Sequence, residues 1–579
     1  MRVYHAGRMA QADEPDRERR AARAPLGRPA PSSLLLALAL GLGLLMHLRA
    51  WSFLCDDAFI SFRYAQNLGQ HGALVYNLDP LERVEGYTNF AWVLLLALGE
   101  ALGLAPERLA PILTASASLT SLLLVALIGA ALRRRFGPGR SAPREQQPAF
   151  EPVDLLAPAL LLLTPEFVVW ASSGLETSFA LALALASVFA WLRGRIELAA
   201  GLAAFAGLTR LDALLGVAAF GLGWLALVAR ETPRPMIRLI PWRRVAIASL
   251  IFAAPLLAQL VVRKIYYDAW LPNTWAVKHH GALLRDSYGI GYLKFWADRL
   301  ALIGLVPLLV LVRPRHVVLI LPIVAQLVWA WSIGGDFMAY GRFLLPATTS
   351  LALLVGLALA EAREQLRARV SPRWIDASWA ALALALLLAA GVRIPDRLQE
   401  DREHAHLHLD PDDPQSGPGF ESVTAMHRFA AIRLAAGAAF AERLPPDTTI
   451  TVGAAGAMPY AAGLTAYDAY GLIDPSVVAT AEPRVDRARP GHQLHASIAT
   501  MLAHKPDLLC HIGYAGERPP SKQLARRMGA PALWTGWACV ETGPIPDRRA
   551  EGGVIPNHFY CCMRPIGRFA ELDPNRRPK

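Results

Sequence analysis

The sequence is poor in the residues and motifs that mark several common protein classes. Five cysteines in 579 residues are too few for a disulfide scaffold, and none forms a Cys-x-x-Cys pair of the kind that binds zinc. No glycine-rich phosphate loop is present, and no segment repeats at a fixed period. Charged residues make up only 18% of the chain. These absences argue against a disulfide-rich protein, a zinc protein, a P-loop nucleotide-binding enzyme and a repeat array.

The sequence is rich in long apolar runs. Hydrophobic residues make up 54% of it, and the mean hydropathy is +0.31, which suggests a strongly apolar part joined to a polar one. The formal net charge is +11, and the arginines lie in short clusters between the apolar runs. A basic soluble protein would suggest nucleic acid, but this placement follows the positive-inside rule. The sequence therefore predicts a multi-spanning membrane protein with no nucleic-acid partner.

Roughly 20 apolar residues cross a bilayer as a helix, and the arginine clusters set the direction of each crossing. We expect about eleven spans, a retained first anchor, a cytoplasmic N-terminus and an outer C-terminus. The short segment 90–104 carries Glu100 and is expected to be interfacial or re-entrant, because a crossing there would place Arg133, Arg134 and Arg135 outside. The expected spans are 32–51, 109–132, 155–170, 179–192, 198–209, 213–228, 245–262, 300–312, 317–331, 343–360 and 374–390.

The chain divides into three expected parts. Residues 1–31 form a disordered cytoplasmic tail, 32–391 a membrane all-α helical domain, and 392–579 a small α/β extracytoplasmic domain. In this last part we expect a helix at 421–444 and strands at 448–452, 507–512, 538–541 and 558–563. Its four cysteines, Cys510, Cys539, Cys561 and Cys562, allow one or two disulfides if the domain is exported, with the pairing left open.

The predicted topology gathers charged residues on the outer side. Ionisable groups at membrane depth are costly and usually face a cavity or a partner, although a single charge at a helix end is more often a solvated or snorkelling residue. Adjacent carboxylates such as Asp56 and Asp57 repel each other. An acid beside an arginine-lined apolar groove suits deprotonation of a hydroxyl next to a lipid phosphate.

Several short motifs follow one another along the chain. The run 56–64 (DDAFISFRY) precedes 84–90 (VEGYTNF), and further motifs stand at 173–177 (SGLET), 209–212 (TRLD), 266–267 (YY), 271–274 (LPNT), 334–338 (GGDFM), 342–343 (RF), 468–475 (DAYGLIDP) and 491–492 (GH). In order and spacing they resemble bacterial GT-C-type glycosyltransferases, most closely the terminal arabinofuranosyltransferases of mycobacterial cell-wall synthesis. The resemblance extends from residue 56 to about residue 492.

The resemblance implies a GT-C-like helix bundle and a transferase that uses a polyprenyl-phosphate-linked sugar. The family's first-loop aspartate corresponds to Asp56 or Asp57, and its phosphate-binding cations correspond to Arg210 and Lys278. Many relatives have proline and glutamate where this chain has 209–212, so the role of Asp212 is open. The other residues expected to bind substrate are Arg63, Glu85, Tyr87, Glu176, Tyr267, Asn273, Asp336, Arg342, Asp468, Tyr470 and His492.

The sequence thus predicts a membrane glycosyltransferase of the bacterial cytoplasmic membrane. The acceptor would be an envelope glycan, lipid or protein on the outer face, with arabinofuranose among the candidate sugars. The sequence establishes no cofactor and leaves metal dependence open: Glu85, Glu176 and Asp336 are candidates for holding sugar hydroxyls or else a divalent cation. A transporter or flippase is the alternative, but such proteins tend to show two related halves and broken helices, and the sequence indicates neither. A non-catalytic scaffold is a third reading. The sugar, acceptor, stereochemistry and oligomeric state stay open.

Overall fold

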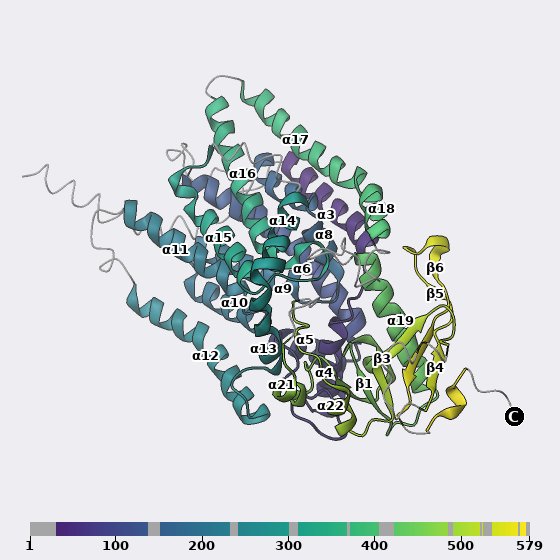
Figure 1. Ribbon diagram of the computed structural model, residues 1–579. Coiled ribbons are helices and arrows are strands. Elements are labelled where there is room, and N and C mark those ends of the chain that lie inside the picture. Colours follow the sequence, from purple (N-terminus) through teal and green to yellow (C-terminus); the bar gives the residue numbers. More distant parts are fainter. Residues whose placement is uncertain are drawn as a thin grey trace, which may run out of the picture.

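The computed structural model describes residues 31–136, 151–231, 241–299, 311–367, 371–404, 422–483, 490–521, 524, 535–565 and 568–574. Nearly all of the expected tail 1–31, and most of the expected span 300–312, lie outside these residues. Within them the chain forms a large helix bundle with a smaller domain containing a sheet at one end (Figure 1).

Among the described residues, seven helices are long and apolar enough to cross a membrane, or eight if one bent pair counts as a span. Two shorter apolar helices, α9 and α10, match two more of the expected crossings. The bundle helices are α3 (Pro31–Trp51), α4 (Ala58–His71), α5 (Phe90–Ala101), α6 (Pro106–Phe136), α7 (Leu156–Leu162), α8 (Pro165–Val169), α9 (Thr177–Leu192), α10 (Ile196–Thr209), α11 (Ala213–Glu231), α12 (Trp242–Tyr267), α13 (Asn273–Lys278), α14 (Ile290–Arg299), α15 (Val317–Ser332), α16 (Leu345–Arg367), α17 (Pro372–Val392) and α18 (Ile394–His404).

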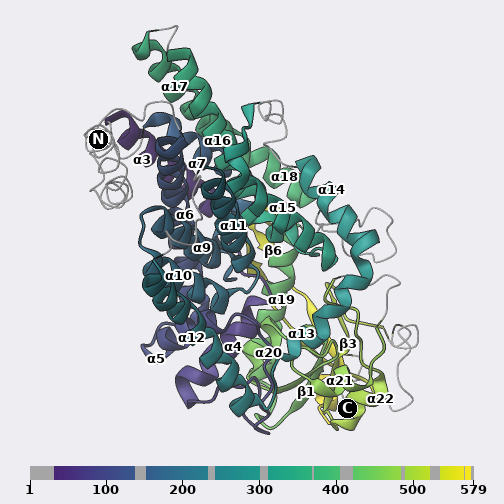
Figure 2. The same cartoon turned by 90° about the vertical axis from the view of Figure 1, so that its left-hand side faces the viewer.

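The segment expected to be interfacial forms α5, whose 12 residues would reach only about 18 Å along a helix axis, short of a bilayer's apolar thickness. Figures 1 and 2 both place α4 and α5 at the end of the bundle that carries the smaller domain. The loop after α3 therefore brings a short helical layer, rather than an extended polar loop, against that domain.

The expected single span at 155–170 is instead broken. Its two parts, 152–162 and 165–172, are bent by 77°. Proline at position 165 lacks a backbone N–H and disfavours helical geometry in the preceding residue, and Thr164 is extended with φ −91° and ψ 124°. Pro165 thus ends one helix and begins the next, a break that the sequence analysis did not foresee.

The arginine-rich helix ends lie together, as the charge rule predicts. Arg133 at the end of α6 donates two hydrogen bonds of 2.8 Å to Asp154. Arg363 of α16 pairs with Glu151 at 2.6 Å, and Arg135 pairs with Glu231 of α11 at 2.5 Å. These contacts join the ends of α6, α11 and α16 on one side of the bundle. That this side is cytoplasmic stays a prediction.

The C-terminal domain is built on a five-stranded sheet of order β2-β1-β3-β7-β4. The strands β2, β1 and β3 are parallel, whereas β7 is antiparallel to β3 and β4. The four expected strands and the expected helix are present, and the four-residue strand β2 was not foreseen. The elements are α19 (Val423–Ala441), β1 (Thr449–Val452), α20 (Ala457–Ala462), β2 (Thr465–Asp468), α21 (Pro475–Thr480), α22 (Ile498–Ala503), β3 (Leu508–Gly516), β4 (Trp537–Glu541), β5 (Ile545–Pro546), β6 (Val554–Ile555) and β7 (Phe559–Met563).

Arg63 of α4 fastens the bundle to this domain. Its buried guanidinium donates hydrogen bonds to the backbone oxygens of Pro459 at 2.6 Å and Leu464 at 2.7 Å, and to that of Tyr76 at 2.7 Å. Asn77 adds a hydrogen bond of 3.0 Å to the Ala466 oxygen. Because one buried guanidinium donates to carbonyls of both domains, Arg63 holds α4 and the α20–β2 segment in a fixed relation.

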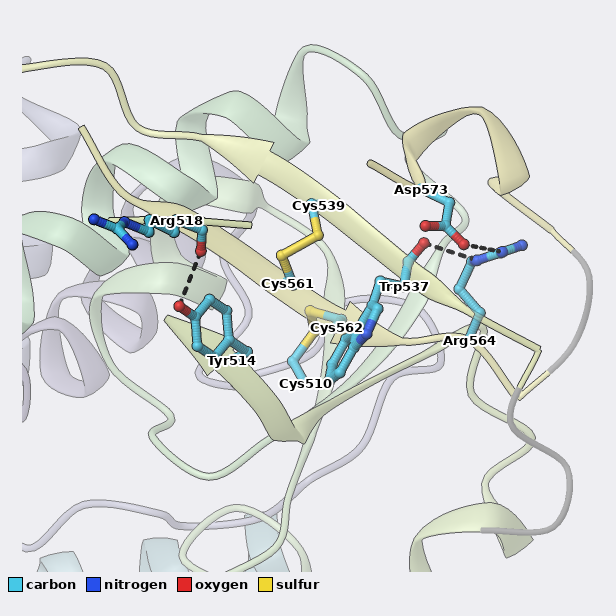
Figure 3. The surroundings of a disulfide bond; sticks show 9 residues. All are labelled: Cys510, Tyr514, Arg518, Trp537, Cys539, Cys561, Cys562, Arg564 and Asp573. Carbon is cyan, nitrogen blue, oxygen red and sulfur yellow. Dashed lines mark hydrogen bonds and ion pairs between the residues drawn. A yellow bond between two sulfur atoms is a disulfide. The ribbon is translucent and has the colours of Figure 1, made fainter. Parts of the chain in front are cut away.

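Two disulfides fasten β7 to its neighbours (Figure 3). Cys561 bonds to Cys539, which lies directly opposite it in β4, and Cys562 bonds to Cys510 of β3. Successive side chains of a strand point to opposite faces, so the two bridges lie on opposite faces of the sheet, each in a separate hydrophobic cluster. Both bridges that the four cysteines allowed are therefore formed.

The Cys539–Cys561 bridge closes a loop of 22 residues, so replacing both cysteines with serine is expected to lower the domain's stability by about 3 kcal/mol. The measurement is thermal unfolding of the full chain in detergent. A reductant should lower the melting temperature of the wild type and leave a variant without all four cysteines unaffected. An unchanged melting temperature in the double variant would contradict the pairing.

Candidate active site

A cavity of about 520 Å³ lies between the C-terminal domain and the end of the bundle that carries α4. This volume falls within the range of small-molecule sites in proteins. Five of the expected site residues, from both parts of the chain, line it: Asp56, Asp57, Asp468, Tyr470 and His492. The cavity is therefore made by the two domains together.

Asp56 is turned toward the C-terminal domain and held there. Its buried carboxylate accepts a hydrogen bond of 3.0 Å from the backbone N–H of Ala457. Gly456 lies so close that a side chain at this position would overlap the carbonyl and carboxylate of Asp56. Burial raises the pKa of Asp56 to about 6, against the opposing effect of the Arg433 charge. This aspartate joins the two domains.

Asp57 is the half-buried neighbour that faces the charged side of the cavity. It occupies the N-cap position of α4 but makes no capping hydrogen bond. Across the described part of the chain its carboxylate has no hydrogen bond or ion pair, while its charge acts on Lys278 and Arg342. A carboxylate without a partner that faces two cations is suited to accept a proton or orient a hydroxyl.

Lys278 is the last residue of α13 and is one of the two cations on which the Asp57 charge acts. Its side chain is solvent-accessible yet surrounded by protein, and burial lowers its pKa while the Asp57 charge opposes that shift. Among the described residues its ammonium makes no hydrogen bond or ion pair. Gly491 of the cavity wall packs beside its stem, where an added Cβ would lie 3.8 Å from the Lys278 Cγ. Lys278 therefore offers an uncommitted charge to an anionic ligand.

Arg210, by contrast, has protein partners on two sides. It donates hydrogen bonds of 3.0 and 2.9 Å to the two oxygens of Asp212 and one of 2.8 Å to Glu176. Glu176 accepts a further hydrogen bond of 2.8 Å from Asn89, which is bonded to Ser61 of α4. Asp212 thus has a role that the sequence left open: with Glu176 it sets the orientation of Arg210.

Arg342 is the third cation of the cluster. It donates a hydrogen bond of 2.5 Å to Asp336, and its guanidinium lies 5.4 Å from the ring centre of Trp170 and 5.0 Å from that of Phe343. A turn with positive φ at Tyr340 and Gly341 reverses the chain between these partners. The expected substrate residues Asp336 and Arg342 therefore form a buried pair.

Arg210 and Arg342 also stand at a narrow apolar groove of about 70 Å³ inside the bundle. Its walls are formed mainly by aliphatic side chains of α9, α11, α15 and α16, such as Leu181, Val217 and Leu353. The groove combines an aliphatic lining with two guanidinium groups and the carboxylate of Asp212, which pairs with Arg210. An amphiphile with an apolar chain and an anionic head suits this combination.

The remaining expected substrate residues contact protein and do not line the cavity. Tyr87 and Tyr267 share a hydrogen bond of 3.2 Å between their hydroxyls. Asn273 donates to the backbone oxygens of Gly471 at 2.6 Å and Leu472 at 3.0 Å. With Arg63, described above, these residues hold the walls of the site in place.

Glu85 has a structural partner as well. Both its carboxylate oxygens bind the guanidinium of Arg263 in α12, one of them at 3.1 Å, and the two side chains are only 2% and 10% exposed. Glu85 thereby ties the end of α12 to the loop before α5.

Replacing Glu85 with alanine is expected to lower the free energy of unfolding by about 3–5 kcal/mol, because it leaves the buried Arg263 charge without a partner. The measurement is the melting temperature of the purified protein. Replacing both residues with leucine should restore much of the loss. Asp268→Asn, which removes the charge of the exposed pair with Lys264 and suits the left-handed backbone at this position, is the control and should change nothing measurable.

On the C-terminal side, Asp468 is buried and accepts hydrogen bonds from the backbone N–H groups of Tyr470 at 2.9 Å and Leu472 at 2.7 Å. Burial raises the pKa of Asp468 to about 7, although these N–H groups favour its ionised form. The ring of His492 packs edge-on against Tyr470 and against Phe337 of the bundle. This wall is ordered by contacts across the domain boundary.

Several cavity residues were not expected from the sequence, among them Phe429 and Arg433 of α19 and His511 of β3. Each lies in an ordinary helical or strand pattern, and only the fold brings α19 and β3 to the same cavity. No group of three or more His, Cys, Asp or Glu residues with metal-binding geometry occurs in the described ranges.

Comparisons with known proteins add a fold relationship. A model of the family described as "Domain of unknown function (DUF8728)" matches residues 423–550. The crystal structure of ArnT from Cupriavidus metallidurans bound to undecaprenyl phosphate superposes with a TM-score of 0.53 at 14% identity, covering 95% of this chain and all of that one. The apo structure of the same protein gives a TM-score of 0.46 at 14% identity, covering 94% of this chain and all of that one. No curated protein shows significant sequence similarity. The fold is a GT-C-like multi-spanning bundle with a small C-terminal domain.

Proposed function

We propose that the protein is a membrane glycosyltransferase that moves a sugar from a polyprenyl-phosphate donor to an acceptor on the outer face of the membrane. One juxtaposition carries the proposal. The uncommitted carboxylate of Asp57 faces the uncommitted ammonium of Lys278, and two guanidinium groups near them stand at an apolar groove. An acid, a cation and an apolar channel at one place suit a lipid phosphate that leaves as a hydroxyl attacks.

In this proposal only the part of the donor's isoprenoid chain next to the phosphate enters the groove of about 70 Å³, and the phosphate lies near Lys278 and Arg342. Burial of the chain against aliphatic side chains contributes roughly 0.8 kcal/mol per methylene group relative to water. The ArnT structure with undecaprenyl phosphate, which has the same fold, supports a ligand of this class here. In this proposal the cations have different roles. Arg210 is held by Glu176 and Asp212, whereas Lys278 is available to bind the phosphate.

The reaction joins an acceptor oxygen to the anomeric carbon of the sugar. Asp57 takes the proton of the acceptor hydroxyl as its oxygen forms the new bond. The bond between the anomeric carbon and the phosphate oxygen breaks, and that oxygen keeps the electron pair. Lys278 and Arg342 stabilise the charge that grows on the phosphate. The experiment below identifies the sugar, for which arabinofuranose is one candidate, and the acceptor.

The proposed orientation places the C-terminal domain outside the cytoplasm. Disulfides persist in oxidising compartments, and this domain carries both bridges found among the described cysteines. Nucleotide sugars are cytoplasmic, so a reaction on the outer side needs a sugar activated on a lipid. Reaction of the four cysteines with an impermeant thiol reagent after reduction of intact cells would test this orientation.

The test is transfer of radiolabelled sugar by the purified full chain in lipid nanodiscs, from a panel of polyprenyl-phosphate sugars that includes arabinofuranose, to crude envelope acceptors. Label appearing in a new glycoconjugate supports the proposal and names the donor. If no donor yields product while the folded protein moves labelled lipid-linked sugar between the leaflets of vesicles, the protein is a flippase and the proposal fails.

A further inference from the structure

Most of the cavity wall beyond Asp57 belongs to the C-terminal domain, and its position follows from the sheet. The chain leaves β1 to form β2 on one side, while β3 pairs on the other side of β1. In open α/β sheets, ligands bind beyond the carboxyl ends of the parallel strands, where the strand order reverses in this way. Here Gly453 and Ala454 follow β1, and His511 continues past the segment of β3 that pairs with it; all three line the cavity.

Two polar side chains at this place have unused hydrogen-bonding atoms. Thr451 and the Nδ1 atom of His511 lie 2.6 Å apart, which fixes the ring, while its Nε2 atom has no partner among the described residues. Burial lowers the pKa of His511 to about 4, so the ring is neutral near pH 7 and has one donor and one acceptor nitrogen. Arg433 donates from Nη1 to the Phe429 oxygen at 3.4 Å, and its Nε–H has no partner in the same ranges.

Aromatic rings surround these polar groups. The Arg433 guanidinium lies over the ring of Phe429, 3.2 Å from its centre, and 5.8 Å from that of Tyr560. Tyr470 and Tyr514 line the same cavity. Flat rings interspersed with hydrogen-bonding groups suit a ligand that has apolar faces and many hydroxyls. An isoprenoid chain suits the aliphatic groove instead, so the two spaces differ in the chemistry they accept.

We infer that this wall is the acceptor site and that the acceptor is a carbohydrate chain, which rests on Phe429, Arg433 and His511 and presents a hydroxyl to Asp57. The inference rests on the proposed function. It assigns the acceptor to the C-terminal domain and makes that domain the determinant of acceptor choice, while the bundle binds the donor.

The test separates binding from transfer. The full chain in detergent is applied to an array of oligosaccharides, and the same oligosaccharides serve as acceptors with the donor at saturation. Arg433→Met and His511→Ala should each raise the acceptor KM and weaken array binding about tenfold or more, as expected for a lost hydrogen bond to a buried or charged group. The donor KM and the melting temperature should stay unchanged.

Arg428→Met is the matched control, because Arg428 lies on the same helix and pairs with Glu517 at the surface instead of lining the cavity. It should leave the acceptor KM unchanged. Sugar transfer only to peptides or lipids, with no oligosaccharide bound, would overturn the inference and leave the proposed function intact. Oligosaccharide binding that depends on Arg433 without any transfer would support the site and contradict the glycosyltransferase proposal.

Discussion

Replacing Asp57 with asparagine is expected to reduce the rate of sugar transfer by about 10²- to 10⁴-fold, the usual contribution of a positioned general base. The amide is nearly isosteric but cannot take a proton. Because the Asp57 carboxylate has no hydrogen bond or ion pair within the described residues, the change should leave folding intact. The measurement is kcat for labelled-sugar transfer, with the melting temperature recorded beside it.

Asp56→Asn is the paired control, since the two residues are neighbours and differ in surroundings. Asp56 accepts a hydrogen bond from Ala457 and packs against Gly456, so its replacement should mainly lower the melting temperature and retain measurable transfer. The reverse result, with full activity in Asp57→Asn and none in a stable Asp56→Asn protein, would exchange the two roles. Full activity in the double asparagine variant would remove both from the mechanism.

Replacing Lys278 with methionine is expected to lower kcat about 10²- to 10³-fold, as observed when one donor to a developing negative charge is removed. Methionine keeps the length of the stem but has no charge, so packing beside Gly491 is retained. The readouts are kcat and the donor KM at saturating acceptor. Lys278→Arg should recover part of the rate.

Lys264→Met is the control for a general loss of positive charge, because Lys264 pairs with the exposed Asp268. It should keep full activity. Equal losses in both variants would show that Lys278 acts through the protein's overall charge and has no specific contact with the phosphate.

Much of the fold could be predicted from the sequence because membrane spans and arginine clusters are local signals. The break at Pro165 had such a signal, a threonine before a proline inside an apolar run, but length and hydropathy alone do not separate a span from a bent pair. Strand β2 has only four residues and is recognised in the structure by its pairing with β1. Features that depend on one segment of the sequence can therefore be predicted well, whereas features that depend on a partner far along the chain cannot.

The candidate site shows the same division. Sequence motifs point to Asp56 and Asp57 together, but only the contact with the segment after β1 shows which of the two is committed to the protein. Arg210 and Lys278 were both expected to bind the donor phosphate, yet of the two only Arg210 pairs with acids, Glu176 and Asp212, in the described residues. Arg433 and His511 belong to no sequence motif. They lie in helix α19 and strand β3, and only the fold brings these two elements to the same cavity.

The cavity shared by two domains also sets an order of events during biosynthesis. Asp56 and the N–H group of Ala457 that holds it are 401 positions apart, which corresponds to a delay of roughly 20 to 80 s at ordinary rates of chain elongation. In the last part of that interval, once α16 has been synthesised, the helices that carry the donor groove exist, while the opposite wall has not been completed. Under the proposed function, the nascent chain would hold a lipid-linked sugar before it could orient an acceptor, and transfer would start only when the last part of the chain had been synthesised and folded.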